Sequence, residues 1–174
     1  PYNWRKPSIV FVCSMSDLFN EKISFNFIDK VFNVIKDTPQ HTYQILTKRA
    51  KRMAEYFESR VIPPNAWIGV TVENRNAIER IDSIRHLDAK VKFLSCEPLL
   101  EDLGELELDG INWIIVGGES GVSARPMNEK WAVNIMNQAH QLNIPFFFKQ
   151  WGTWGCDGIK RNKRKNGKLI NGEI

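Results

Sequence analysis

The sequence contains no apolar run that approaches the roughly 18 residues a membrane-spanning helix needs. Residues 1–7 include no apolar segment of the kind that a secretory signal peptide carries. These two absences predict a cytoplasmic protein without a membrane partner. The chain also begins without an initiator methionine, which leaves open whether Pro1 is its natural N-terminus.

Cysteine is scarce, with three residues at widely separated positions: Cys13, Cys96 and Cys156. An odd number of cysteines without paired spacing argues against a disulfide framework and indicates a reducing compartment. Cys13 and Cys96 fall within apolar stretches, where a free cysteine is most often a small buried hydrophobic residue.

Familiar catalytic and metal-binding motifs are missing as well. The three histidines show no HxxxH or HxH spacing, so they indicate no zinc site. There is no GxSxG motif and no Cys/His arrangement that indicates nucleophilic catalysis. Neither a GxGxxG nor a Walker loop is present, which removes the usual nucleotide fingerprints.

Apolar runs of strand length recur along the chain, most of them continuous and rich in Val, Ile and Phe. This pattern is typical of strands buried on both faces of a parallel sheet. Helical patterns separate the runs, and Ser24 and Asn128 are predicted N-caps. The predicted strands are 8–13, 42–46, 66–72, 91–95, 112–116 and 145–148, and the predicted helices are 24–36, 51–60, 76–87 and 129–142.

Strands that alternate with helices form a parallel sheet with right-handed crossovers. An open doubly wound sheet and a complete or partial barrel both fit this alternation, but six strands are too few for an eight-stranded barrel. We therefore predict an α/β fold, a parallel (β/α) repeat that forms a partial TIM-like barrel of about six strands over residues 1–151. A short basic C-terminal extension, residues 152–174, follows it.

The net charge of +4 is unevenly spread, because residues 160–168 contain six basic and no acidic side chains. Such a run either contacts the phosphates of a nucleic acid or forms a solvated tail or hairpin. The sequence leaves both alternatives open.

Polar residues directly follow each predicted strand. In parallel α/β folds these positions converge at one end of the sheet, where ligands bind. We therefore expect a small-molecule ligand at the C-terminal face, although strand ends meet solvent and loops are polar in any case. The candidate residues are Ser14, Ser16, Asp17, Lys48, Thr71, Glu73, Glu97, Gly117, Gly118, Glu119, Ser120 and Lys149.

Three carboxylates in this set, Glu73, Glu97 and Glu119, could bind an amine, ribose hydroxyls or a metal, or could act as acid and base. Lys48 and Arg49 could instead pair with Asp17 or Glu73 in a purely structural ion-pair network. The candidate catalytic residues are Lys48, Glu97 and Glu119.

The glycine-rich segment Gly117–Gly121 leaves a predicted strand. Its backbone amides could cradle a phosphate or a carboxylate, with Arg125 adding positive charge. The alternative is a tight turn between a strand and the next segment.

The strand-end phrases taken together closely resemble those of one family. They are SMSDLF (14–19), TPQHTYQILTKR (38–49), WIGVTVE (67–73), FLSCEPL (93–99), GGESG (117–121), FFKQWG (147–152) and KLING (168–172). On these phrases the chain is identified as a member of the phage gp thirty-seven/sixty-eight family, whose function is unassigned. The resemblance runs across nearly all 174 residues.

Members of that family resemble radical S-adenosylmethionine enzymes, in which three cysteines ligate a [4Fe–4S] cluster. The cluster and S-adenosylmethionine lie at the C-terminal mouth of a partial barrel. The resemblance implies that the methionine amino group is contacted by Ser14, Ser16 and Asp17, and the ribose by Thr71 and Glu73. It implies that the adenine, the carboxylate or the substrate is contacted by Glu97, Gly117, Gly118 and Ser120.

One departure from the family pattern matters most. The chain has no CxxxCxxC motif, so it lacks ligands for the expected cluster and should not cleave S-adenosylmethionine reductively. We expect either a naturally short protein or a fragment.

Three functions therefore remain as hypotheses. The first is a radical S-adenosylmethionine-like enzyme domain that lacks its iron–sulfur segment, with an unknown substrate. The second is a cluster-free nucleotide or nucleic-acid binding module that uses Lys48, Arg49, Arg125 and the basic tail. The third is a phosphate-binding barrel enzyme that grips its ligand with Gly117–Gly121.

Overall fold

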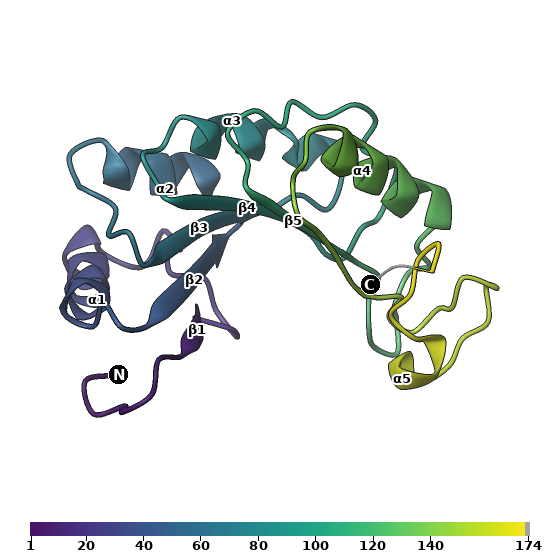
Figure 1. The fold of residues 1–174 in the computed structure, drawn as a ribbon, viewed down its shortest axis with the longest axis horizontal. Coiled ribbons are helices and arrows are strands. Elements are labelled where there is room, and N and C mark those ends of the chain that lie inside the picture. The colour runs from purple at the N-terminus through teal and green to yellow at the C-terminus, as the bar shows by residue number, and fades with distance from the viewer. Residues whose placement is uncertain (173–174) are drawn as a thin grey trace.

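The structure, a computed structural model that describes residues 1–172, is built on one sheet of six parallel strands. The strands lie side by side in chain order, and the sheet curls into an arch that is half of a barrel (Figure 1). The predicted α/β partial barrel is confirmed. The strands are β1 (Ile9–Val12), β2 (Thr42–Thr47), β3 (Ala66–Thr71), β4 (Val91–Cys96), β5 (Trp113–Gly117) and β6 (Phe146–Gln150).

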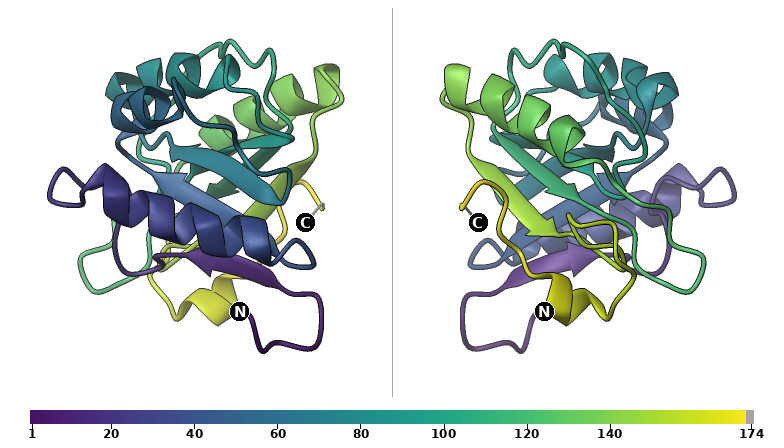
Figure 2. Two further views of the ribbon diagram at one scale, coloured as in Figure 1. Left: turned by 90° about the vertical axis from the view of Figure 1, so that its left-hand side faces the viewer. Right: turned by 90° about the vertical axis from the view of Figure 1, so that its right-hand side faces the viewer.

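Helices cover the convex face of the arch and leave the concave face open (Figure 1). They are α1 (Phe25–Asp37), α2 (Ala50–Phe57), α3 (Glu79–Arg85), which a 3-10 turn η1 (Arg75–Ala77) precedes, and α4 (Glu129–Gln141). The short helix α5 (Lys163–Asn166) instead lies on the concave side (Figure 2). Within residues 1–172, no helix is both long and apolar enough to cross a membrane.

Both predicted N-caps are confirmed. The Ser24 hydroxyl accepts a hydrogen bond from the Phe27 amide at 3.3 Å, and Asn128 Oδ1 accepts one from the Lys130 amide at 3.0 Å. Such caps satisfy amides that have no partner inside the helix. They fix the starts of α1 and α4, so residues 13–24 and 118–128 are left to form loops at the C-terminal end of the sheet.

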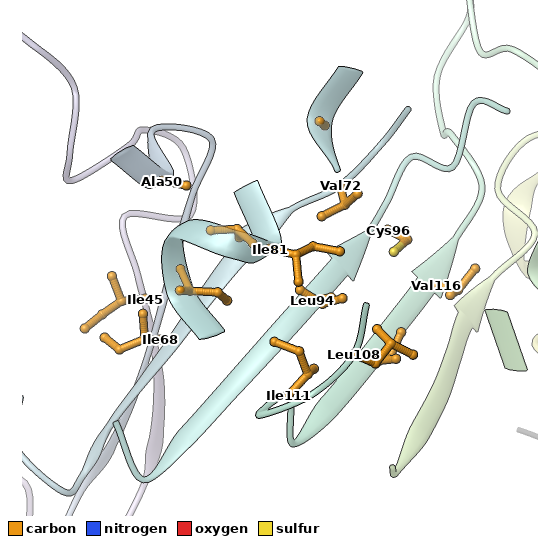
Figure 3. Packing of buried hydrophobic residues seen from close by; sticks show 14 of the residues in the cluster. Ile45, Ala50, Ile68, Val72, Ile81, Leu94, Cys96, Leu108, Ile111 and Val116 are labelled. Carbon is orange, nitrogen blue, oxygen red and sulfur yellow. The ribbon is translucent and has the colours of Figure 1, made fainter. Parts of the chain in front are cut away.

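The main core lies between the convex face of the sheet and the helices. Ile45 of β2, Ile68 of β3 and Leu94 of β4 point to this side and are almost completely buried (Figure 3). The parallel register places Ile45 beside Ile68 and Val70 beside Leu94, so aliphatic side chains form rows across the sheet. Because a buried side chain of this size contributes about 1.5–3 kcal/mol, this layer is a main source of stability.

The concave face carries a row of aromatic rings, which we call the aromatic floor: Phe11, Trp67, Phe93, Trp113 and Phe147. These residues alternate along their strands with the residues that face the helices. The centroid of the Trp113 ring lies 5.7 Å from that of Phe93 and 6.0 Å from that of Trp67. Trp67, Phe93 and Trp113 are therefore a connected set of rings on β3, β4 and β5, and Phe11 of β1 and Phe147 of β6 lie outside this set on the same face.

The sequence predicted strands buried on both faces, and this prediction holds for the convex face and for the centre of the concave face, where Phe93 is 1% exposed, but it is wrong at the β1 edge. On the concave face, Ile9 and Phe11 are 67% and 45% exposed. A Cβ atom on Gly69 would lie 2.4 Å from the Phe93 ring. Glycine at this position therefore allows the ring to lie directly against the sheet.

The C-terminal extension folds back onto the barrel. Trp154 and Lys160 form an antiparallel bridge at the base of a hairpin. Trp151 Nε1 donates a hydrogen bond to the Leu169 carbonyl at 2.9 Å, and Ile170 is buried in the same core as the strands. The hairpin and the residues that follow it are thus anchored, while Glu173 and Ile174 lie outside the described residues.

The one-sided core leads to a testable difference between two isoleucines. Ile68→Ala should lower the free energy of unfolding by about 2–5 kcal/mol, because it removes methyl groups from a completely buried site. Ile9→Ala, at a strand position that is 67% exposed, should change it by less than about 0.5 kcal/mol. Urea unfolding followed by circular dichroism measures both, and equal losses would contradict the one-sided core.

Candidate functional site

Asp17, in the loop after β1, is held entirely by groups of the protein. Its Oδ1 accepts hydrogen bonds from the Thr47 hydroxyl at 2.7 Å and the Phe19 amide at 2.9 Å. Its Oδ2 accepts them from the Lys48 amide at 3.2 Å and the Arg49 guanidinium at 2.9 Å. Burial raises the pKa of Asp17, but these hydrogen bonds outweigh it and hold the pKa below 3.8. A carboxylate has about four acceptor sites, and Asp17 uses them for donors within the protein. Because most of these donors lie at the end of β2 or just after it, Asp17 joins the loop after β1 to the end of β2.

Glu73, just beyond β3, is the centre of a second ion-pair group. Its Oε1 lies 2.8 Å from Lys48 Nζ and its Oε2 lies 2.8 Å from Arg80 Nη1. Arg80 also donates a hydrogen bond to the Thr71 carbonyl at 2.7 Å. Burial raises the pKa of Glu73, whereas the hydrogen bond from Lys48 and the charges of both cations lower it below 4.5 overall. The structure thus pairs Lys48 with Glu73 and Arg49 with Asp17, which are ion pairs of the structural-network alternative. Thr71 lies next to this network through its hydrogen bond from Arg80.

Arg80 is a member of this network that the sequence analysis missed. It lies inside a predicted helix, and the helical pattern alone does not show which side chain reaches back to the end of a strand. Its spacing is the signal that could have indicated this contact. Arg80 lies seven residues after Glu73, one turn into the following helical segment, and its side chain reaches back to Glu73.

Glu97 forms a third, more open group on the concave side of the mouth. Its Oε2 lies 2.8 Å from Lys149 Nζ, and its Oε1 accepts a hydrogen bond from Gln150 Nε2 at 3.0 Å. The same Gln150 amide group donates to the Ser120 hydroxyl at 3.2 Å. The Lys149 side chain is 52% exposed, whereas that of Glu97 is 16% exposed. This group therefore combines a sheltered carboxylate with a cation that solvent can reach.

The glycine-rich loop lies against the segment that follows β6. A Cβ atom on Gly118 would lie 2.0 Å from the Trp151 carbonyl oxygen, so the close approach of two backbones requires glycine there. The amide of Gly118 donates to the Gln150 carbonyl and that of Gly121 donates to the Thr153 hydroxyl, each at 2.9 Å. The arrangement of this loop favours the tight turn over the anion cradle.

Glu119 in this loop pairs with Arg125. The Arg125 side chain donates hydrogen bonds to both carboxylate oxygens at 2.8 Å, and its backbone amide donates a further one at 2.8 Å. The hydrogen bonds from the Arg125 side chain and amide lower the pKa of Glu119 to about 2. Glu119 therefore lies in a pair of its own, separate from the Glu97 and Glu73 groups.

The remaining candidates differ in exposure. Ser14 and Ser16 lie in an exposed turn after β1, in which the Ser16 amide donates a hydrogen bond to the Cys13 carbonyl. Thr71 is buried at the end of β3. Of these hydroxyl groups, those of Ser14 and Ser16 are directly accessible to a ligand.

Two cavities lie outside the mouth, one beside it and one at the opposite end of the strands. A cavity of about 300 Å³ next to the mouth is lined by Lys48, Arg49 and Arg80, among others. A larger cavity of about 620 Å³ lies between α1 and α2, near Pro39 and Pro63 at the N-terminal ends of the strands. Because the polar groups converge at the other end, we assign the candidate site to the open mouth and not to the larger cavity.

The cysteines do not form a metal centre. Within residues 1–172 there is no group of three or more His, Cys, Asp or Glu side chains that could hold a metal ion. Cys96 is completely buried, and burial, with a smaller effect from the charge of Glu73, raises the pKa of its thiol to about 12. Cys156 is exposed in the hairpin of the extension.

The Asp17 hydrogen bonds predict how stability depends on pH. A carboxyl group whose pKa is lower in the folded chain stabilises the fold above its unfolded pKa, and this contribution is lost as the pH falls through the folded pKa. Asp17→Asn should therefore lower the free energy of unfolding by about 1–3 kcal/mol at pH 7 and flatten its decrease below pH 3.8. The exposed Asp109→Asn is the matched control, and similar acid profiles for the two variants would contradict this role of Asp17.

The three thiols should differ in reactivity toward a disulfide reagent at pH 8. Cys156 should react first because it is exposed. Cys96 should react only after the chain unfolds, since the thiolate is the reactive form and burial opposes it. Mass spectrometry of the labelled peptides, with and without urea, checks the order, and labelling of Cys96 in the native chain would contradict the structure.

The comparisons with known proteins give one match. A family model described as "Protein of unknown function (DUF5131)" matches residues 1–174. No curated protein and no solved structure matches significantly. The description names no activity, so the resemblance to phage proteins and to radical S-adenosylmethionine enzymes stays a prediction. With the whole sequence matched, the chain belongs to the DUF5131 family.

Proposed function

We propose that the chain binds S-adenosylmethionine at the C-terminal mouth of its half-barrel, as the ligand-binding part of a radical S-adenosylmethionine-like domain. The sequential order of its parallel strands is that of the partial barrels to which the family resemblance points. The mouth sets polar side chains next to one ring of the aromatic floor, because Phe147 lies two residues before Lys149 on β6. A nucleoside ligand uses both, since its base stacks on aromatic rings and its sugar needs hydrogen-bonding partners.

The Glu97 group is the observation that carries the proposal. Its carboxylate has one cationic partner, Lys149, whose side chain is 52% exposed, and one neutral partner, the Gln150 amide. A Cβ atom on Gly117 would lie 3.2 Å from Glu97 Oε1, so glycine at this position lets the carboxylate lie against the backbone. Glu97 can then accept hydrogen bonds from ribose hydroxyls or an ammonium group, and Lys149 can pair with a ligand carboxylate.

The other candidate residues take supporting roles in this proposal. Ser14 and Ser16 offer exposed hydroxyls for the methionine end of the ligand. Asp17 and Glu73 act as positioning residues, because Asp17 accepts hydrogen bonds from four protein donors and Glu73 lies between two cations. Glu97, by contrast, has one cation and one neutral amide as its partners. Lys48 is held by Glu73. Among the candidate catalytic residues, Glu97 is thus the one best arranged to touch a ligand.

The described residues do not fit a [4Fe–4S] cluster, which needs closely spaced thiolates. When bound, S-adenosylmethionine supplies an electrophilic sulfonium centre, and this chain's own residues bind and orient it. The phosphate-binding alternative has weaker support, because the amides of Gly118 and Gly121 are engaged within the protein.

Isothermal titration of the chain with S-adenosylmethionine tests the proposal. Binding should be measurable, and Glu97→Gln should weaken it about tenfold or more, because a hydrogen bond to a charged group contributes about 1.5–3 kcal/mol. The exposed Glu105→Gln makes the same chemical change away from the mouth and should leave the affinity unchanged.

Two outcomes would count against the proposal. If the intact chain does not bind S-adenosylmethionine at millimolar concentrations, the resemblance is architectural only. If Glu97→Gln and Glu105→Gln bind equally well, the ligand lies elsewhere. S-adenosylhomocysteine, which lacks the sulfonium charge, serves as a second probe. If a carboxylate lies near the sulfonium of S-adenosylmethionine, S-adenosylhomocysteine should bind more weakly because it lacks this charge.

A further inference from the structure

The aromatic floor offers ring faces that the protein does not fully cover. Trp67, Trp113 and Phe147 are partly exposed, and Phe11 is 45% exposed. Phe11 lies in register with Gln44 of β2, which lies in register with Trp67, and the Trp67 ring contacts the Trp113 ring. Phe147 lies at the other edge, on β6, and Phe93 in the centre is buried and offers no free face. The accessible rings of this face form the kind of surface on which successive bases of a single nucleic-acid strand stack.

The positive charge of the chain is concentrated in the C-terminal extension. Residues 152–174 contain six basic and two acidic residues, so their net charge is +4. This is the net charge of the whole chain, and residues 1–151 are therefore neutral overall. The basic residues of the mouth are paired with carboxylates, as Lys48 is with Glu73 and Lys149 with Glu97. The extension is therefore the main source of unbalanced positive charge.

Most cations of the extension have no acidic partner within the part of the chain that the structure describes. Arg161 pairs with Asp157. Lys163, Arg164 and Lys165 on α5 and Lys168 beyond it are exposed and form no ion pair among residues 1–172. These four cations can therefore bind an anion without losing a partner.

The fold places these cations on the same side of the sheet as the aromatic floor. In two views, α5 lies on the side of the sheet opposite α2, α3 and α4, at the β6 end of the arch (Figures 1 and 2). The hydrogen bond between Asn166 Nδ2 and the Gly152 carbonyl, at 2.9 Å, ties α5 to the end of β6. The hydrogen bond from Trp151 to the Leu169 carbonyl anchors the segment that follows. The basic residues are thus fastened to one side of an open aromatic surface.

We propose that the concave face binds a single strand of nucleic acid, with bases on the aromatic floor and phosphates on Lys163, Arg164, Lys165 and Lys168. A single strand fits better than a duplex, because a duplex hides the faces of its bases. The inference rests on the proposed function in one respect: the strand would present a nucleoside to the ligand held at the Glu97 group. It names nucleic acid as the class of substrate.

Fluorescence anisotropy with a labelled fifteen-nucleotide oligothymidylate tests this surface. Reversing the charges of Lys163, Arg164 and Lys165 to Glu should weaken binding at least tenfold. It should also reduce the slope of log K against log salt by about two, since each phosphate contact on a single strand contributes about 0.7. Reversing Lys30, Lys36 and Lys130, exposed on α1 and α4, makes the same charge change on the convex side and should have little effect.

A second pair of variants tests the aromatic floor without changing charge. Phe11→Ala should weaken binding about fivefold or more, because base stacking on one ring is worth that much or more. Phe27→Ala removes a ring of similar exposure, 51% against 45%, from the convex helix α1 and should leave binding unchanged. Thermal melts of all variants check that each one is folded.

Several outcomes separate this inference from the proposed function. Binding of S-adenosylmethionine without binding of the oligonucleotide at low salt would overturn the inference and leave the proposed function standing. The inference would also be overturned if both charge variants weakened oligonucleotide binding equally, or if poly-glutamate displaced the oligonucleotide as well as nucleic acid does. Either result would mean that the protein attracts polyanions in general. A stable dimer that buries Phe11 and does not bind the strand would assign the concave face to a second copy and would also overturn it. Specific oligonucleotide binding without S-adenosylmethionine binding would support the surface and reject the proposed ligand.

Discussion

The burial of one face of a parallel sheet is the constraint on which the rest of this structure depends. Ile45, Ile68 and Leu94 present aliphatic side chains to the helices. Each helix returns the chain to the same side, so the sheet curls, and the strand ends converge on one mouth. Both the polar groups of the mouth and the open aromatic floor follow from this geometry, because the residues that alternate with the core positions have no helix to cover them.

The carboxylates at the mouth divide into two kinds. Asp17 and Glu73 are enclosed by donors from other strands and helices, and they hold the loops after β1 and β3 in place. Glu97 has one cation and one neutral amide as its partners, and its carboxylate lies against the backbone of Gly117. The difference arises from their neighbours, since the three side chains have the same charge and follow strands in the same way.

Much of the fold could be predicted from the sequence, because strands, caps and their alternation depend on local patterns. The parallel half-barrel and the caps at Ser24 and Asn128 are examples. The sequence could not show that the concave face is open, since a continuous apolar run has the same pattern whether one face or both are covered. It also could not assign Arg80 to Glu73 or place Ile170 in the core, because both depend on how distant segments pack.

The contact between Gly69 of β3 and Phe93 of β4 limits which residues can replace either of them during evolution. The ring of Phe93 occupies the space where any side chain at position 69 would begin. A change of Gly69 to a larger residue therefore requires a smaller residue at position 93 in the same lineage, and the exchange would move the bulk of the floor from β4 to β3. Positions 69 and 93 should accordingly vary together among relatives of this chain, and the contour of the concave groove would shift with them.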